Sequence, residues 1–242
     1  MGRMRKYDNT QYDGLLLVDK PIGWTSHDIV NLVRRRFRQN KVGHCGTLDP
    51  LATGLIVIVL NKGTKLSQHL SGEAKTYLGT ITLGQETDSQ DAEGKVVAEY
   101  DMSAVVAADI EALVPQFSGP IEQVPPMFSA LKRDGKTLYD LARQGIEVKR
   151  EARPVTINEL RIEKVDLPSF DVFVDCSKGT YIRTLAYDMG KALGGGAHLT
   201  GLRRLKSGNF KIEDSFTIET IKSWETFEEM APNLQPLPVI SL

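Results

Sequence analysis

The sequence is poor in the residues that build disulfide frameworks and metal sites, with two cysteines and four histidines among 242 residues. Cys45 and Cys176 are too few for a disulfide framework and have no C-x-x-C spacing. The histidines are scattered without the spacing of metal ligands. We therefore predict no metal site and a reduced, cytoplasmic location.

Motifs for common cofactors and long apolar runs are also missing. No G-x-G-x-x-G follows a strand pattern, and no P-loop G-K-[ST] or G-x-S-x-G nucleophile elbow occurs. The longest apolar run, residues 55–60 (LIVIVL), is too short to span a bilayer, and the polar start MGRMRKYDNTQYDG is unlike a signal peptide. The sequence predicts no cofactor and no membrane association.

Net charge is close to zero, but positive charge is concentrated in a few places. The formal net charge of −1 argues against a protein that simply coats nucleic acid. The basic clusters are Arg34, Arg35, Arg36 and Arg38 with Lys41, then Lys149, Arg150 and Arg153, and finally Arg203 and Arg204 with Lys206. Residues 213–242 hold six acidic residues against one lysine. This asymmetry predicts a basic face for a polyanionic partner.

Strand patterns alternate irregularly with helical ones along the chain. Strands are predicted over residues 15–18, 55–60 and 77–84, around 172–174, and from 198 to 210. Helices are predicted from a Ser26 cap to residue 37, over 109–117, 138–144 and 180–193, and as one amphipathic helix over 218–230. Residues 86–95 are expected to form a solvent loop, and 120–136 an irregular excursion. Because neighbouring strands are joined by loops too short for βαβ crossovers, we predict an α+β fold with a mixed sheet.

The segment GHCGTLDPLATG, residues 43–54, places one carboxylate in a glycine-rich loop before an apolar strand. Pro50 keeps Asp49 out of the helical region and in an extended conformation. A carboxylate restricted in this way can be presented to a substrate. An Asx turn or a helix cap would use the same residue, and the motif alone leaves both interpretations open.

Further residues, in this segment and elsewhere in the sequence, favour contact with RNA bases. Lys178–Arg183 (KGTYIR) follows a strand pattern and opens a helix, where main-chain amides and Arg183 can meet an anion. Tyr77 stands early in its strand beside Lys75, and His44 precedes Asp49 by five residues. Aromatic residues interleaved with basic ones are typical of surfaces on which unpaired bases stack. The alternatives are a tyrosine at the core edge, a surface arginine and a histidine bonded to a loop carbonyl.

Taken together, these segments resemble bacterial tRNA pseudouridine synthases of the TruB family. The matching segments are LLLVDKPIGWTSHDIV, KVGHCGTLDPLATGLIVIVL, GTKLSQ, KTYLGTITLGQETDSQDAEG, VPPMFSALKRDGKTLYDLARQG, CSKGTYIRTLAYDMG and GAHLTGLRRLKSG. They run in order from about residue 15 to 208, and an ordered series is far more specific than one motif. Guide-dependent relatives typically carry Lys-Val-Thr-Gly in place of Leu-Ala-Thr-Gly, so residues 51–54 favour the stand-alone type.

The resemblance implies a mainly antiparallel sheet flanked by helices, with an active cleft across its middle. It implies isomerisation of the uridine at position 55 in the T-loop of tRNA, without a cofactor. Asp49 matches the catalytic aspartate, Arg183 its arginine partner, and Tyr77 the tyrosine that stacks on uracil. Residues matching other substrate contacts are Tyr181 and Leu202 (uracil pocket), His44 (flipped nucleotides), and Lys20 with Pro21 (first motif). The arginines of the clusters at 34–38 and 203–204 are expected to hold RNA phosphates.

The resemblance also divides the chain. It implies a polar N-terminal extension over residues 1–14, a catalytic domain over 15–230 and a short proline-rich tail over 231–242, without the RNA-binding PUA domain common in the family. We expect a monomer that acts on the T-arm of tRNA. An RNA-binding protein that folds tRNA with secondary catalysis, and a hydrolase that releases free uracil, are the alternatives. Attack of Asp49 on C1′, addition to uracil and abstraction of a sugar proton all stay open.

Overall fold

The structure is a computed structural model, which describes residues 11–238. Contacts divide the chain into two units, one formed by residues 1–73 and 204–242 and the other by residues 74–203. Most of the predicted N-terminal extension and the last four residues of the predicted tail lie outside the described residues. In the described part, no helix is long and apolar enough to cross a membrane.

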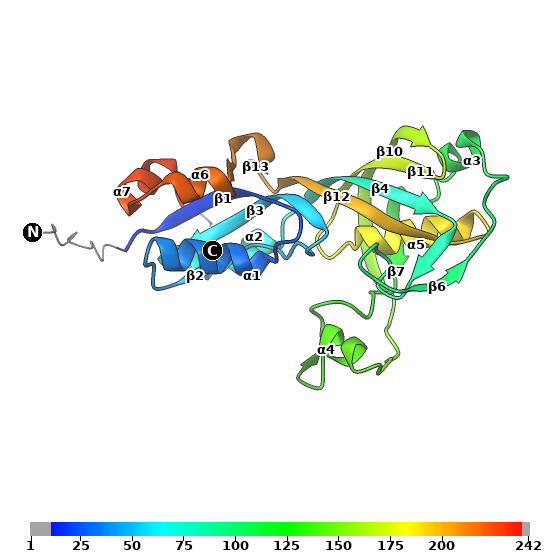
Figure 1. The fold of residues 1–242 in the computed structure, drawn as a ribbon, viewed down its shortest axis with the longest axis horizontal. Helices are drawn as coiled ribbons and strands as arrows, with labels where there is room; N and C mark the ends of the chain where they lie inside the picture. The colour runs from blue at the N-terminus through cyan, green and yellow to red at the C-terminus, as the bar shows by residue number, and fades with distance from the viewer. Residues whose placement is uncertain (1–10, 239–242) are drawn as a thin grey trace, which may run out of the picture. The chain divides into compact units, whose positions relative to one another are not determined.

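The first unit is built on two long antiparallel strands, β1 (Gly14–Lys20) and β3 (Ala52–Leu60) (Figure 1). Short β2 (Val42–His44) pairs antiparallel with β3, and β14 (Phe216–Thr217) pairs parallel with β1. The strands predicted over residues 15–18 and 55–60 are therefore confirmed. Their side chains Leu15, Leu17, Leu55, Val57 and Val59 form a buried cluster.

Helix α1 (Ser26–Arg36) follows β1 and packs beside β2. The predicted cap at Ser26 is wrong, because Thr25 is the N-cap and shares a capping box with Asp28. The buried Ser26 hydroxyl instead donates to the Leu48 carbonyl at 3.1 Å and accepts from the Leu48 amide at 2.8 Å. This side chain ties the start of α1 to the loop that carries Asp49.

The C-terminal part of this unit differs from the single helix predicted over 218–230. It forms α6 (Ile218–Ser223) and α7 (Phe227–Met230), because Trp224 is extended and its ring packs on Phe216 at 5.1 Å. The remaining short elements are η1 (Asn61–Leu66), α2 (Ser67–Ser71), β13 (Phe210–Lys211), η2 (Ile212–Asp214) and η3 (Ala231–Asn233). The start of the predicted tail is anchored, since Gln235 exchanges two main-chain hydrogen bonds with Leu15.

The second unit contains an antiparallel array in the order β4 (Lys75–Leu83), β11 (Ser169–Cys176), β10 (Arg153–Asp166) and β7 (Gly119–Gln123). Strand β12 (Ala197–Ser207) adjoins β4, and its last residues belong to the first unit. Helix α5 (Ile182–Ala192) packs on β4 through a largely buried face. Strand β10 was not predicted from the sequence. Two bulges, between Ile157 and Glu159 and between Ile162 and Lys164, interrupt its alternation of apolar and polar residues.

Smaller elements connect these strands. They are β5 (Gln85–Thr87) paired with β6 (Val96–Glu99), α3 (Ala107–Glu111), β8 (Lys132–Arg133) paired with β9 (Lys136–Thr137), and α4 (Leu138–Arg143). The prediction of a solvent loop over 86–95 is wrong for Glu86, Ser89 and Asp91, which are buried. Ser89 and Asp91 belong to the site described next.

Candidate functional site

Two buried cations hold the loop that carries Asp49. The Arg204 guanidinium donates to the carbonyls of Leu55 at 2.6 Å, Gly46 at 3.1 Å and Thr47 at 3.5 Å. The Lys20 ammonium donates to the carbonyls of Trp24 at 2.6 Å, Pro21 at 3.1 Å and Pro50 at 3.4 Å. Charged donors inside the fold bind carbonyls strongly, so both ends of the loop are fixed.

Lys20 and Arg204 were predicted to contact the RNA substrate, and their burial contradicts this prediction. Arg204 is 1% exposed and Lys20 is 0% exposed. A guanidinium or ammonium group enclosed in this way cannot contact a phosphate or a base, because it lies away from the surface and its N–H groups already bind main-chain carbonyls. The structure therefore assigns Lys20 and Arg204 a supporting role behind the Asp49 loop, in place of the predicted contacts with RNA.

Main-chain contacts restrict the loop further. The Ala52 amide donates to the Asp49 carbonyl at 3.0 Å, and the Gly23 amide donates to the Pro50 carbonyl at 2.9 Å. Gly54 has φ +98°, and a Cβ at this position would lie 2.4 Å from the Arg204 carbonyl oxygen. Only glycine fits there. The half-buried Asp49 carboxylate is thus presented from a rigid backbone.

His44 ends β2 just before this loop and is half-buried. Burial, followed by the positive charge of Arg204 and the nearby His27, lowers the pKa of the His44 imidazole. A lowered pKa keeps the ring neutral at physiological pH. A neutral imidazole can stack on a base or exchange a hydrogen bond with it, which suits the predicted contact with flipped nucleotides.

In the second unit, the structure brings Tyr181 and Arg183 together at the start of α5. The Arg183 guanidinium carbon lies 5.9 Å from the centre of the Tyr181 ring. The Arg183 side chain is buried and donates to Asp91 Oδ2 at 3.3 Å, to the Phe128 carbonyl at 2.6 Å and to the Ser89 carbonyl at 3.5 Å. The guanidinium is therefore held from two segments that are far apart in the sequence.

Asp91 is the main residue that sequence reasoning missed. Its side chain is only 4% exposed, and its Oδ1 accepts from Ser89 Oγ at 2.5 Å and from the Glu93 amide at 3.1 Å. These bonds turn Oδ2 toward Arg183. The signal in the sequence is weak, because Asp91 lies in the polar run ETDSQDAEGK, whose composition indicates a solvent loop.

The other predicted residues are distributed over both units. Tyr77 lies on β4 and is buried, and Leu202 and Arg203 lie half-buried on β12. Pro21, His44 and Asp49 belong to the first unit, whereas Tyr77, Tyr181, Arg183 and Leu202 belong to the second. The pairing of Asp49 with Arg183 stays a prediction.

The arginines at positions 34–38 differ in the hydrogen bonds that their side chains make. Arg34 donates to the Val42 carbonyl at 3.0 Å, and Arg36 donates to the Trp224 carbonyl at 2.9 Å and also to the Lys222 carbonyl. Arg35, Arg36 and Arg38 are exposed, and Arg35 and Arg36 line a cavity of about 780 Å³ along the helix. Arg35 is thus better placed for a phosphate than its anchored neighbours.

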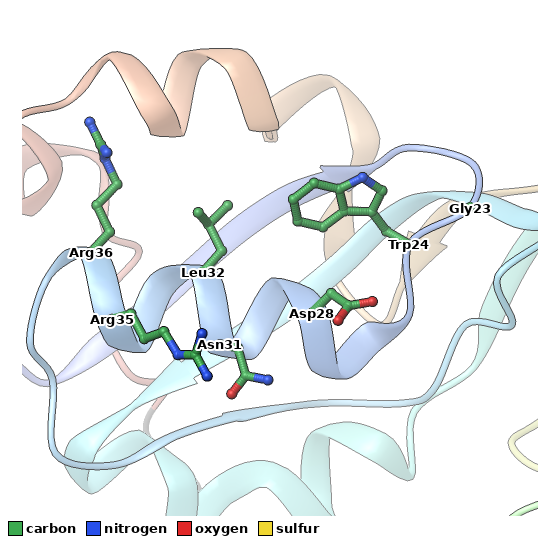
Figure 2. A pocket seen from close by; sticks show the side chains of 7 residues that line it. All are labelled: Gly23, Trp24, Asp28, Asn31, Leu32, Arg35 and Arg36. Carbon is green, nitrogen blue, oxygen red and sulfur yellow. The ribbon is translucent and has the colours of Figure 1, made fainter.

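Figure 2 shows this cavity along α1, with Asn31 and Arg35 projecting close together and Trp24 and Leu32 beside the same helix. The full lining consists of Gly23, Trp24, Asp28, Asn31, Leu32, Arg35 and Arg36. An indole, an amide and a guanidinium can together stack on a base, bond to its edge and hold a phosphate.

Within residues 11–238, no group of three or more His, Cys, Asp and Glu side chains could hold a metal ion.

Comparisons with known proteins identify the family of the chain. A model described as the TruB family pseudouridylate synthase N-terminal domain matches residues 34–182, and one described as the tRNA pseudouridylate synthase B C-terminal domain matches residues 183–238. The tRNA pseudouridine synthase B of Syntrophotalea carbinolica is 46% identical over 230 residues, which cover 95% of this chain and 73% of the relative. That of Opitutus terrae is 44% identical over 233 residues, covering 95% and 97%.

A solved structure gives the same fold. A chain in the crystal structure of a Cbf5-Nop10-Gar1 complex superposes with a TM-score of 0.72 at 28% identity, covering 93% of this chain and 60% of that chain. This chain thus spans three fifths of that neighbour. The predicted α+β fold with a mainly antiparallel sheet is confirmed, and so is the resemblance. The chain belongs to the TruB family of pseudouridylate synthases.

Proposed function

We propose that the chain converts the uridine at position 55 in the T-loop of tRNA to pseudouridine, with the Asp49 carboxylate as the catalytic group. The observation that carries this proposal is the rigid presentation of Asp49, whose loop is held by buried Lys20 and Arg204. Catalytic groups need such preorganisation, because a displaced carboxylate loses much of its rate advantage.

The reaction needs nothing beyond side chains and RNA. The N1–C1′ glycosidic bond breaks, the uracil turns, and a C5–C1′ bond forms while the proton on C5 is lost to solvent and N1 gains one. A base inside folded tRNA must first leave its stack, at a cost of a few kcal/mol. Tyr77 would stack on the uracil, Tyr181 and Leu202 would line its pocket, and His44 would contact the displaced nucleotides.

Arg183 is the proposed partner of Asp49. Asp91 holds its guanidinium in place through an ion pair at 3.3 Å. A guanidinium close to Asp49 would keep that carboxylate ionised in a partly apolar pocket. Arg183 would thereby both orient the catalytic carboxylate and maintain its charge.

The RNA would be held by three arginines, of which two are exposed and one is half-buried. Arg35 in the α1 cavity, Arg38 and Arg203 are the proposed phosphate contacts, and the T-arm of tRNA is the proposed partner of a monomeric, cytoplasmic protein. Such contacts position the RNA without reading its sequence, and they weaken as salt concentration rises.

Tritium release from tRNA tests the proposal. A transcribed tRNA carrying tritium at C5 of its uridines is converted under single-turnover conditions by wild type and by Asp49→Asn. Wild type should release tritium, Asp49→Asn should not, and replacing the uridine at position 55 by cytidine should abolish release. Tight tRNA binding without release by wild type would overturn the enzyme proposal and leave a tRNA-folding role.

A further inference from the structure

A buried glutamine contacts the main chain beside Arg183 from a distant part of the sequence. Gln123 is the last residue of β7 and is 2% exposed. Its Oε1 accepts from the Tyr181 amide at 3.0 Å, and its Nε2 donates to the Tyr181 carbonyl at 3.2 Å. The side-chain amide therefore binds both main-chain groups of residue 181, as a paired strand would.

This contact lies where α5 begins. Tyr181 is the N-cap of α5, with an extended backbone at φ −99° and ψ 109°, and its own side chain does not cap the helix. Helix starts without a side-chain cap depend on other groups for their orientation. Gln123 supplies that support, and Arg183 follows two residues later in the first turn of the helix.

The same segment also binds the Arg183 side chain. The Phe128 carbonyl, five residues after Gln123, accepts from Arg183 Nη2 at 2.6 Å. Between them lie Pro125 and Pro126, both buried, whose rings fix the backbone angle φ. Gln123 and Phe128 therefore form two ends of a stiff brace, one on the main chain of Tyr181 and one on the guanidinium of Arg183.

The brace is connected to the following segment, residues 130–149, which carries α4. The Tyr139 amide in α4 donates to the Ser129 carbonyl at 3.0 Å, and the rings of Phe128 and Tyr139 meet edge to face at 5.9 Å. The exposed cations of the segment from residue 130 to 149 are Lys132, Arg133, Lys136, Arg143 and Lys149. A basic, exposed segment is thus connected through a few contacts to Arg183.

We propose that Gln123 is a positioning residue for the isomerisation, which sets the main chain of Tyr181 and thereby the aim of the Arg183 guanidinium. This inference rests on the proposed function. Gln123 does not touch the substrate; it acts through Tyr181 and Arg183. Loss of its amide should lower the rate of the chemical step and leave RNA affinity nearly unchanged.

The test compares Gln123→Ala, Gln123→Glu and the exposed control Gln116→Ala. Each variant is assayed for the single-turnover rate at saturating tRNA and for the Kd of tRNA. We expect Gln123→Ala to lower the rate about 10- to 100-fold, as small displacements of positioned groups do, with Kd within about twofold. Gln123→Glu keeps the acceptor for the Tyr181 amide and should retain more activity than Gln123→Ala, and Gln116→Ala should match wild type.

Hydrogen exchange of the Tyr181 amide, followed by NMR, gives a readout that does not depend on catalysis. Exchange should accelerate in Gln123→Ala and stay slower in Gln123→Glu. Faster exchange with an unchanged rate, or a loss that lies wholly in Kd, would overturn the inference. If Gln123→Ala does not fold, Gln123→Met, which has a similar size but lacks both hydrogen-bonding groups, takes its place, and a wild-type rate for that variant would overturn the inference. If wild type itself releases no tritium, the proposed function fails, and exchange still decides whether Gln123 fixes Tyr181.

Discussion

The guanidinium of Arg183 and the carboxylate of Asp91 lie 3.3 Å apart, and both side chains are more than nine-tenths buried. A buried ion pair is costly to form but more costly to break, because removal of one partner leaves the other charge in the interior. Since the loop with Asp91 and the helix with Arg183 are far apart in sequence, this pair joins them in a defined geometry.

Asp91→Asn should therefore impair both stability and catalysis. The substitution keeps the shape and removes the charge that faces Arg183, so we expect the free energy of unfolding to fall by about 3 kcal/mol. Urea denaturation measures this loss, and single-turnover tritium release measures the rate. Asp101→Asn, at an exposed site, is the control; equal effects at both positions would contradict the importance of the pair.

Arg35→Ala and Arg36→Ala should separate RNA binding from folding. Arg35 is exposed in the α1 cavity, so its loss should weaken tRNA binding and reduce the slope of log Kd against log salt by about one. Arg36 donates to carbonyls of α6 and its C-cap, so its loss should lower Tm. Filter binding at several salt concentrations and thermal unfolding distinguish the two; a salt slope unaltered by Arg35→Ala would exclude a phosphate at this position.

Gly54→Ala should be far more damaging than Gly179→Ala. Both glycines have positive φ, +98° and +79°, which costs an alanine about 1–2 kcal/mol. At Gly54 the new Cβ would also meet the Arg204 carbonyl oxygen at 2.4 Å, whereas at Gly179 nothing lies within 4 Å. We expect Gly54→Ala to unfold at lower denaturant and to lose activity, because the Asp49 loop must shift. Similar midpoints for the two variants would show that the loop tolerates the displacement.

The partly buried carboxyl of Asp188 should make the stability of the protein depend on pH. Burial raises the pKa of its carboxyl from 3.8 to about 6. The folded protein therefore holds this proton more tightly than the unfolded chain, so the contribution of Asp188 to stability falls as pH rises from about 4 to 6 and is level above that. Asp188→Asn should raise Tm at pH 7 relative to wild type and have little effect at pH 4. A Tm difference independent of pH would mean that the pKa is not raised.

The local signals in the sequence predicted the elements that depend on local patterns. The runs at 15–18 and 55–60 are central strands because continuous apolar side chains can be buried on both faces. The order of the motifs led to the family without any structural information. The prediction failed for β10, whose bulges break its alternation, and for residues 218–230, where the packing of Trp224 interrupts the helix.

What the sequence determined by itself was the identity of the chemical groups: a restricted Asp49 before a buried strand, an aromatic at 77 and an arginine opening a helix. Only the tertiary structure decided which polar residues are buried and hold the functional side chains in place. Arg203 and Arg204 are adjacent and identical in type, yet Arg204 is buried behind the Asp49 loop. Asp91 and Gln123 likewise look like surface residues in the sequence. Burial and hydrogen bonding depend on contacts between distant segments, and only folding brings those segments together.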